Sequence, residues 1–311
     1  MLQQTRVEAV KPYFDRFLAA LPTVEALAAV DDQTLHKLWQ GLGYYSRARN
    51  LRRAAIAVCE KHGGVIPRTV SELLALPGIG PYTAGAVAAF AYGEPAPAVD
   101  GNVLRVISRL LGEEGDILSP AVRARLTDAV REMLPPDAPS EFGQGLIELG
   151  ALVCVPNTAP RCEVCPLSGV CIAHRDGSWD EIPYRSPKRP RRIERRTVLV
   201  VRSGERVLLS KRPDRGLLAG LWEFPSLAGE ANEADVLERV RTLGLEPIRI
   251  EPTDRAKHIF THIEWHMTGF LVRVAEPDAL PSAPLAMPTI AEIDERYAIP
   301  SAFAKFLRLL R

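Results

Sequence analysis

The sequence has almost no excess charge of either sign and no long apolar run. Its 39 lysines and arginines stand against 38 aspartates and glutamates, so the formal net charge at pH 7 is +1. The net charge therefore does not indicate a nucleic-acid partner, and any binding of nucleic acid must come from local basic patches. The longest weakly polar run, residues 83–93, is far shorter than the ~20 residues that a membrane-spanning helix needs. Because no charged-then-apolar leader opens the chain, we expect a soluble, cytoplasmic protein with no membrane partner.

The apolar pattern changes along the chain. Residues 1 to about 150 carry apolar positions at helical spacing, interrupted by proline and glycine, and this predicts an all-helical half. Thr69 and Glu72 have the spacing of a capping box at a helix start. From TVLVVRS onward the pattern is that of strands, with a hairpin predicted around Ser203 and Gly204. Further strands, a helix over 232–243 and a closing helix from Ser301 predict an α+β order.

A basic segment separates the two patterns. Residues 185–196, RSPKRPRRIERR, hold seven basic residues, two prolines and one acid, which is typical of a linker. Either it is a solvated tether or part of it contacts phosphate. We therefore predict a helical domain over 1–184, a basic linker over 185–196 and an α+β domain over 197–311.

Cysteine is scarce but crowded. Of five cysteines, four lie between positions 154 and 171, which favours a metal or cluster over a disulfide framework. Cys154, Cys162, Cys165 and Cys171 are separated by seven, two and five residues. Only one CxxC is present, so this uneven spacing favours four thiolates around one iron-sulfur cube, with zinc as the alternative. Cys59 is most simply a small buried apolar residue.

The stretch LPGIGPYTAG predicts a tight turn before a helix. Gly78 and Gly80 permit positive φ and close backbone approach, and the following helix presents free N–H groups at its first turn. This arrangement suits a phosphate of a DNA duplex. An ordinary turn between two helices fits the glycine spacing equally well.

Several stretches together resemble one family. LPGIGPYTAG, the VDGNV that follows it, MLQQTRV, GLGYYSRARNL, FGQGLIELGALVC and the cysteines resemble the helix-hairpin-helix DNA glycosylase superfamily that includes endonuclease III. The resemblance covers nearly the whole chain and extends to adenine DNA glycosylases of the MutY type, which remove adenine mispaired with 8-oxoguanine. It implies an all-α glycosylase domain with an iron-sulfur loop at 154–171, followed by a Nudix-like α+β domain. It also implies a 4Fe-4S cluster on the four cysteines, although the first gap is one residue longer than is usual.

The resemblance assigns roles to two residues near the turn. Asp100 stands at the place of the catalytic aspartate, whose fixed carboxylate stabilises the positive charge that develops on the sugar. Tyr82 stands where lyase members have a lysine, and tyrosine cannot form a Schiff base, so a monofunctional glycosylase is implied. Taken alone, Asp100 would read as a turn or cap residue and Tyr82 as a packing aromatic.

A general acid is also required, because the adenine must leave protonated. The family places this glutamate two residues before the methionine of its MLQQT motif, which is upstream of Met1. We therefore expect the 311-residue polypeptide to be severely impaired as it stands, and we expect an in-frame glutamate codon two codons before Met1.

Other positions are implied to contact DNA. Leu2, Gln4, Thr5 and Tyr44 match family positions that enter the duplex around the lesion pair, with Tyr44 as an aromatic wedge. The arginines that follow are expected either to bind phosphate or to form a solvated helix face: Arg47, Arg49, Arg52 and Arg53. The implied partner is double-stranded DNA carrying A:8-oxoguanine or A:G mispairs, bound by a monomer.

The stretch RGLLAGLWEFPS resembles Nudix hydrolases, which hold magnesium on a glutamate-rich helix ending in Glu-Glu-x-Gly. With the alignment set on Gly244, Glu238 is retained, but Arg241 and Thr242 take the paired carboxylate places, so we expect no hydrolase activity. The implied role is lesion reading through residues 260–262, because Phe260, Thr261 and His262 match a Phe-Ser-His loop. The simpler alternative makes FTHIEW an amphipathic strand.

Two other functions stay open at this point. An endonuclease III-like glycosylase with lyase activity on damaged pyrimidines is disfavoured by Tyr82 and by the second domain. A non-catalytic lesion-binding protein is favoured only by the missing general acid.

Overall fold

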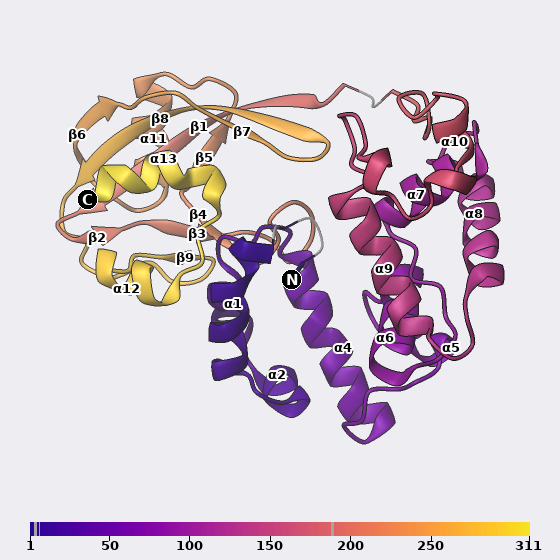
Figure 1. The fold of residues 1–311 in the computed structure, drawn as a ribbon. Helices are drawn as coiled ribbons and strands as arrows, with labels where there is room; N and C mark the ends of the chain where they lie inside the picture. Colours follow the sequence, from indigo (N-terminus) through magenta and orange to yellow (C-terminus); the bar gives the residue numbers. More distant parts are fainter. Residues whose placement is uncertain (3–4, 6, 188–189) are drawn as a thin grey trace. The chain divides into compact units, whose positions relative to one another are not determined.

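The computed structural model describes residues 1–2, 5, 7–187 and 190–311 (Figure 1). The chain forms two compact units, one of residues 1–52 together with 189–311, and the other of residues 53–188. No helix in the described ranges is both long enough and apolar enough to cross a bilayer. The boundaries predicted above at 184 and 197 do not coincide with the ends of these units and stay a prediction.

The 53–188 unit is helical, as predicted. Its helices are the second part of α4 (Ser46–His62), α5 (Val70–Leu74), α6 (Pro81–Tyr92), α7 (Gly101–Leu111), α8 (Pro120–Met133), α9 (Pro139–Leu152) and α10 (Ile172–Arg175). Helix α9 packs on both α6 and α7, and Figure 1 shows the three together. The apolar stripe of α7 lies in the core of this unit, where Val103 and Ile107 are fully buried.

Local signals fix where these helices begin and what they pack against. Thr69 caps α5, with its hydroxyl accepting a hydrogen bond from the Glu72 N–H at 3.3 Å, so the predicted cap is confirmed. In α6, a Cβ on Gly85 would lie 2.1 Å from the Pro97 carbonyl oxygen. Only glycine therefore lets the segment before Asp100 lie directly against α6.

The other unit contains a six-stranded and a three-stranded sheet. The larger sheet consists of β1 (Arg192–Ser203), β2 (Arg206–Val207), β5 (Ser226–Ala228), β6 (Pro247–Pro252), β7 (Ala256–Ile259) and β8 (Ile263–Val274). Its centre is the parallel pair β1 and β8, which lie side by side in Figure 1. The smaller sheet consists of β3 (Leu209–Lys211), β4 (Trp222–Glu223) and β9 (Leu285–Ala286).

These strands and their helices confirm the α+β prediction. Ser203 pairs with Arg206, so the predicted hairpin around Ser203 and Gly204 is present. The helices are α11 (Glu233–Thr242), α12 (Ile290–Arg296) and the short closing α13 (Ala304–Leu307). Strand β1 begins at Arg192, inside the segment predicted to be linker, because its charged N-terminal part already pairs with β8.

Three N-terminal helices belong to the same compact unit: α1 (Val7–Ala20), α2 (Val24–Ala29) and α3 (Asp32–Trp39). Their core residues share an apolar cluster with Leu221 and Ala298. The Lys37 ammonium donates to the Ile293 carbonyl at 3.2 Å, and the Gln40 amide donates to the Ile299 carbonyl at 3.1 Å. Buried apolar contacts and side-chain hydrogen bonds to main-chain carbonyl groups thus join these helices to the α+β part.

Candidate functional site

The predicted glycine turn lies between α5 and α6. Gly78 has φ +77°, a left-handed conformation that favours glycine, and both Gly78 and Gly80 are exposed. Gly80 is the N-cap of α6 and offers no side-chain cap, while Pro81 at the first helical position has no N–H. The first turn of α6 therefore leaves its backbone open to an outside acceptor such as phosphate.

Asp100 is the N-cap of α7, and its carboxylate is held at both oxygens. Oδ1 accepts the backbone N–H groups of Asn102 and Val103, each at 2.8 Å, and Oδ2 accepts the Asn102 side-chain amide at 2.9 Å. The side chain is only half-buried. The cap interpretation is therefore right, and it is compatible with a catalytic role because capping fixes the carboxylate without enclosing it.

Tyr82, in the first turn of α6, lies within range of the electrostatic field of this carboxylate. Burial, and secondly the negative charge of Asp100, raise the pKa of the Tyr82 phenol. The phenol therefore stays protonated at neutral pH and remains a hydrogen-bond donor. The structure thus brings together the two residues that the sequence singled out around the turn.

Two arginines that the sequence reasoning missed connect α7 with the cysteine loop. Arg105 donates to the Asn102 side-chain oxygen at 3.1 Å and to the carbonyl oxygens of Gly150 at 2.6 Å and Cys154 at 2.8 Å. Arg109 donates to the Cys154 sulfur at 3.3 Å. The sequence did contain an indication of their role, because the two arginines stand four residues apart within the apolar face of α7. Buried arginines need hydrogen-bond or charge partners.

The four clustered cysteines line one cavity. Arg109 and Trp179 are also in its wall. Burial, and then the neighbouring cysteines, raise the pKa of the Cys162 thiol. All four are free thiols, as is Cys59, which is half-buried in α4. Among the residues that the structure describes, no three histidine, cysteine or acidic side chains are grouped so as to hold a metal ion.

The other predicted DNA-contacting residues lie in the unit that contains the sheets. Leu2 is exposed and Thr5 half-buried, while Gln4 lies outside the described residues. Tyr44 is half exposed, at 52%, and has the unusual φ of +47°. Its hydroxyl lies 3.5 Å from the Thr261 hydroxyl, although 217 positions separate the two residues. The structure thus brings a predicted wedge and a predicted lesion reader together.

The arginines after Tyr44 make contacts inside the protein. Arg47 donates to the Met1 carbonyl at 3.1 Å, and Arg49 donates to the Ala219 carbonyl. Arg52 forms an ion pair with Asp32 at 2.7 Å. These contacts favour a structural role for the three over a phosphate-binding face.

Residues 260–262 form the turn between β7 and β8, so FTHIEW is not one continuous strand. The Phe260 N–H donates to the Ile263 carbonyl at 2.8 Å, which closes the turn. The Phe260 ring packs edge-on against Trp265, with 4.8 Å between ring centroids, whereas Thr261 and His262 are exposed. In this turn, Phe260 is thus held by the protein interior, while Thr261 and His262 face solvent.

The last turn of α11 presents the residues that replace the Nudix carboxylates. Glu238, Arg241 and Thr242 lie on the solvent side of the helix. The Thr242 hydroxyl donates to the Arg239 carbonyl at 2.8 Å. A guanidinium and a hydroxyl thus stand where a magnesium site would need two carboxylates.

A helix-hairpin-helix turn followed by a fixed aspartate, together with a Nudix-type sheet, defines a DNA glycosylase of base excision repair. Residues 1–132 match the HhH-GPD superfamily of base excision DNA repair proteins, and residues 197–309 match the NUDIX domain. The chain is 34% identical to the adenine DNA glycosylase of Mus musculus over 99% of this chain and 70% of that protein. It therefore belongs to the adenine DNA glycosylase family.

Two further relatives agree with this membership. The adenine DNA glycosylases of Rattus norvegicus and Homo sapiens are 35% and 34% identical over 85% of this chain. The chain spans 61% and 58% of the length of those two proteins.

Solved structures resemble the helical part. A thermostable thymine-DNA glycosylase is 31% identical, covers 56% of this chain and 80% of its own, and has a TM-score of 0.52. A non-covalent endonuclease III–DNA complex is 28% identical, covers 57% of this chain and 80% of its own, and has a TM-score of 0.50.

Proposed function

We propose that this chain is a monofunctional DNA glycosylase that hydrolyses the N-glycosidic bond of adenine mispaired with 8-oxoguanine or guanine. The observation that carries the proposal is the Asp100 carboxylate, held by three hydrogen bonds beside the helix-hairpin-helix turn. The family membership, and the DNA bound in the related endonuclease III complex, support double-stranded DNA as the partner. The protein acts as an intracellular monomer.

Each residue at the turn has a distinct role in this reaction. Asp100 stabilises the positive charge that develops at the sugar carbon when adenine leaves. Gly78 and Gly80 hold a nearby phosphate through backbone N–H groups. Tyr82 lies close to Asp100 but has no amine, so water and not the protein is the final nucleophile.

The four cysteines that line one cavity hold a 4Fe-4S cluster. Their thiolates are the donors that such a cluster requires, and the Arg109 guanidinium next to the Cys154 sulfur offsets part of the negative charge. When bound, the cluster supplies a rigid loop for DNA contact and takes no part in hydrolysis. Zinc is disfavoured because the four cysteines contain only one CxxC and are unevenly spaced.

The residues of the other unit read the lesion pair. Tyr44 is the wedge that fills the gap left by the extruded adenine, assisted by Leu2, Gln4 and Thr5. Thr261 presents a hydroxyl that can donate to or accept from 8-oxoguanine, and His262 lies exposed beside it. The half-exposed ring of Tyr44 and its contact with Thr261 support this division of roles.

The test is incubation with a duplex that carries adenine opposite 8-oxoguanine, followed by gel analysis with and without alkali. It is run on this chain and on a version preceded by the family's glutamate-bearing segment. Strand cleavage only after alkali supports the proposal. Cleavage without alkali would instead indicate a lyase. Binding without any base release by the version with the glutamate-bearing segment would indicate a lesion-binding protein.

A further inference from the structure

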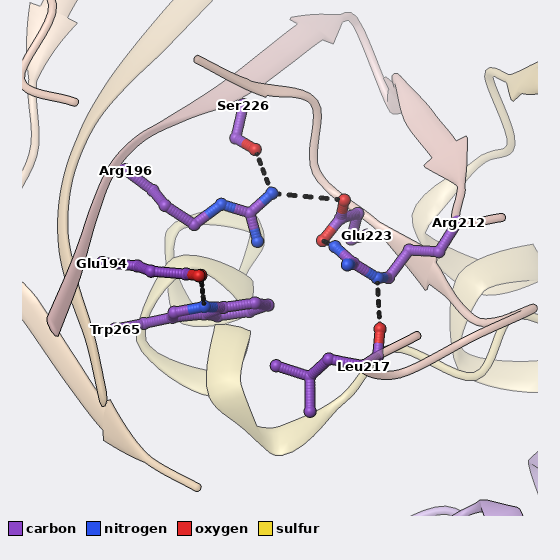
Figure 2. A network of polar contacts seen from close by, with 7 residues as sticks. All are labelled: Glu194, Arg196, Arg212, Leu217, Glu223, Ser226 and Trp265. Atoms are coloured by element: carbon purple, nitrogen blue, oxygen red, sulfur yellow. Dashed lines mark hydrogen bonds and ion pairs between the residues drawn. The ribbon is translucent and has the colours of Figure 1, made fainter. Parts of the chain in front are cut away.

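Residues from β1, β4 and β8 take part in a buried polar network, which Figure 2 shows. At its centre is Glu223, a buried carboxylate that accepts Arg212 at 2.6 Å and Arg196 at 3.5 Å. Arg196 also donates to the Ser226 hydroxyl at 2.6 Å. Buried charges are expensive unless they are paired in this way, so the network has a fixed geometry.

Arg196 and Arg212 share the carboxylate of Glu223, and Arg196 also lies next to a tryptophan ring. The Arg196 guanidinium lies 4.2 Å from the centroid of the Trp265 ring, and its buried Nη1 has no hydrogen-bond partner in the described residues. The negative face of an indole is a favourable neighbour for such a cation. The Trp265 ring N–H donates to Glu194 at 2.9 Å. The Trp265 ring is therefore held in place by Arg196 at its face and by Glu194 at its nitrogen.

Trp265 in turn anchors the turn of residues 260–262. The Phe260 ring packs on it edge-to-face, which leaves Phe260 half-buried while Thr261 is exposed. The start of β1 holds the turn's main chain, since Arg191 donates to the Phe260 carbonyl and the Arg192 N–H donates to the His262 carbonyl, both at 3.1 Å. The position of Thr261 thus depends on the Trp265 ring as well as on these two hydrogen bonds.

We propose that Arg196, paired with Glu223, is a positioning residue that sets the preference for 8-oxoguanine over guanine by fixing Trp265 behind the turn. This inference rests on the proposed role of Thr261 as lesion reader. Arg196 touches no DNA in it. Its effect is on where the Thr261 hydroxyl stands, and a hydroxyl displaced by a fraction of an ångström loses its hydrogen bond to the lesion.

The experiment compares Arg196→Met with Arg195→Met. Methionine keeps the length of the stem and removes the charge in both variants. Arg195 is the neighbouring strand residue, but its side chain is 64% exposed and pairs only loosely, at 3.5 Å, with the exposed Glu230. Dissociation constants are measured at one salt concentration for duplexes with adenine opposite 8-oxoguanine and opposite guanine, since binding does not require turnover.

We expect Arg196→Met to weaken binding of the 8-oxoguanine duplex and not of the guanine duplex, so that the ratio of the first affinity to the second falls about tenfold. Arg195→Met should leave this ratio unchanged. Arg196→Lys keeps a positive charge, but an ammonium group cannot pair with Glu223 and lie on the Trp265 ring at the same time. The affinity ratio of this variant should therefore fall less than that of Arg196→Met. If Arg196→Met does not fold, the lysine variant decides.

Two results overturn the inference alone: folded Arg196 variants with the wild-type ratio, or an equal loss of affinity for both duplexes, which indicates a general structural role. A wild-type protein that has no preference for 8-oxoguanine overturns the proposed role of Thr261 as lesion reader, and this inference with it, but leaves the proposed glycosylase activity untouched.

Discussion

Asn102 holds both oxygens of Asp100, through its backbone N–H to Oδ1 at 2.8 Å and through its side-chain amide to Oδ2 at 2.9 Å. The same side chain accepts a hydrogen bond from Arg105, which also donates to the Cys154 carbonyl. The orientation of the carboxylate is therefore set by helix α7 and by the start of the cysteine loop together. This arrangement makes the site sensitive to packing changes that never touch DNA.

Gly85→Ala tests one such packing change. The new methyl would lie 2.1 Å from the Pro97 carbonyl oxygen and push away the segment that leads to Asp100. We expect a loss of about 1–3 kcal/mol in the free energy of unfolding, measured by urea denaturation, and a lower rate of excision. Gly145→Ala is the matched control on α9, because a Cβ added there would meet no described atom within 4 Å. It should be neutral or slightly stabilising, and equal effects of the two changes would contradict the argument.

Tyr82→Lys tests the proposal that Tyr82 leaves the protein without a lyase step. A lysine there places an amine where Tyr82 now lies near Asp100. Borohydride should trap a covalent complex of this variant with DNA that contains an abasic site, and it should trap none with Tyr82 in place. Trapping by the unsubstituted chain would refute the monofunctional assignment.

Cys165→Ser tests the cluster. Loss of one of the four proposed ligands in the cavity should abolish the visible absorption band and most of the bound iron and sulfide. The unfolding temperature should fall as well, because the loop loses its support. Cys59→Ser removes the thiol outside the loop and should retain full iron content. A purified protein that binds one zinc and no iron would overturn the assignment.

The buried His36 side chain should make the free energy of unfolding depend on pH. Its ring is 2% exposed and its Nε2 has no hydrogen-bond partner in the described part of the chain. Burial, as the main cause, lowers its pKa from 6.5 to about 4. The unfolded chain therefore binds a proton more readily, so stability is complete above pH ~6.5 and falls as the pH drops toward 4, by about 1–3 kcal/mol in total.

The measurement for His36 is the free energy of unfolding in urea at several pH values. His36→Phe should flatten the fall between pH ~6.5 and 4, whereas His62→Phe should keep it. An unchanged pH profile in His36→Phe would show that other groups cause the acid sensitivity.

Much of the fold was readable from local pattern. The helical half, the cap at Thr69, the hairpin at Ser203 and Gly204 and the change to strands all follow from residue spacing, and the structure confirms them. Such signals depend on neighbours in sequence. The start of β1 at Arg192 was missed because a charged, proline-containing segment reads as linker, and only its pairing with β8 makes it a strand.

The sequence names candidate reactive groups of the site but not the residues that support them. The four cysteines stand out by residue type and spacing, whereas Asp100 is singled out by the family resemblance. Arg105 and Arg109 were missed because their partners are backbone carbonyls and a sulfur some 45 positions away. The contact between Tyr44 and Thr261, over 217 positions, has no local signal at all. Long-range polar contacts are set by packing, which composition and periodicity do not encode.

The central claim is that the Asp100 carboxylate carries the chemistry. Asp100→Asn can keep the helix cap, because an amide oxygen accepts the same two backbone N–H groups, so the fold should be retained. The decisive measurement is single-turnover release of adenine opposite 8-oxoguanine by the version with the glutamate-bearing segment. Asp128→Asn, which alters an exposed carboxylate on α8, serves as the control. We predict that Asp100→Asn lowers the rate by about 10²–10⁴-fold and Asp128→Asn leaves it unchanged. Undiminished release by a folded Asp100→Asn protein would contradict the account.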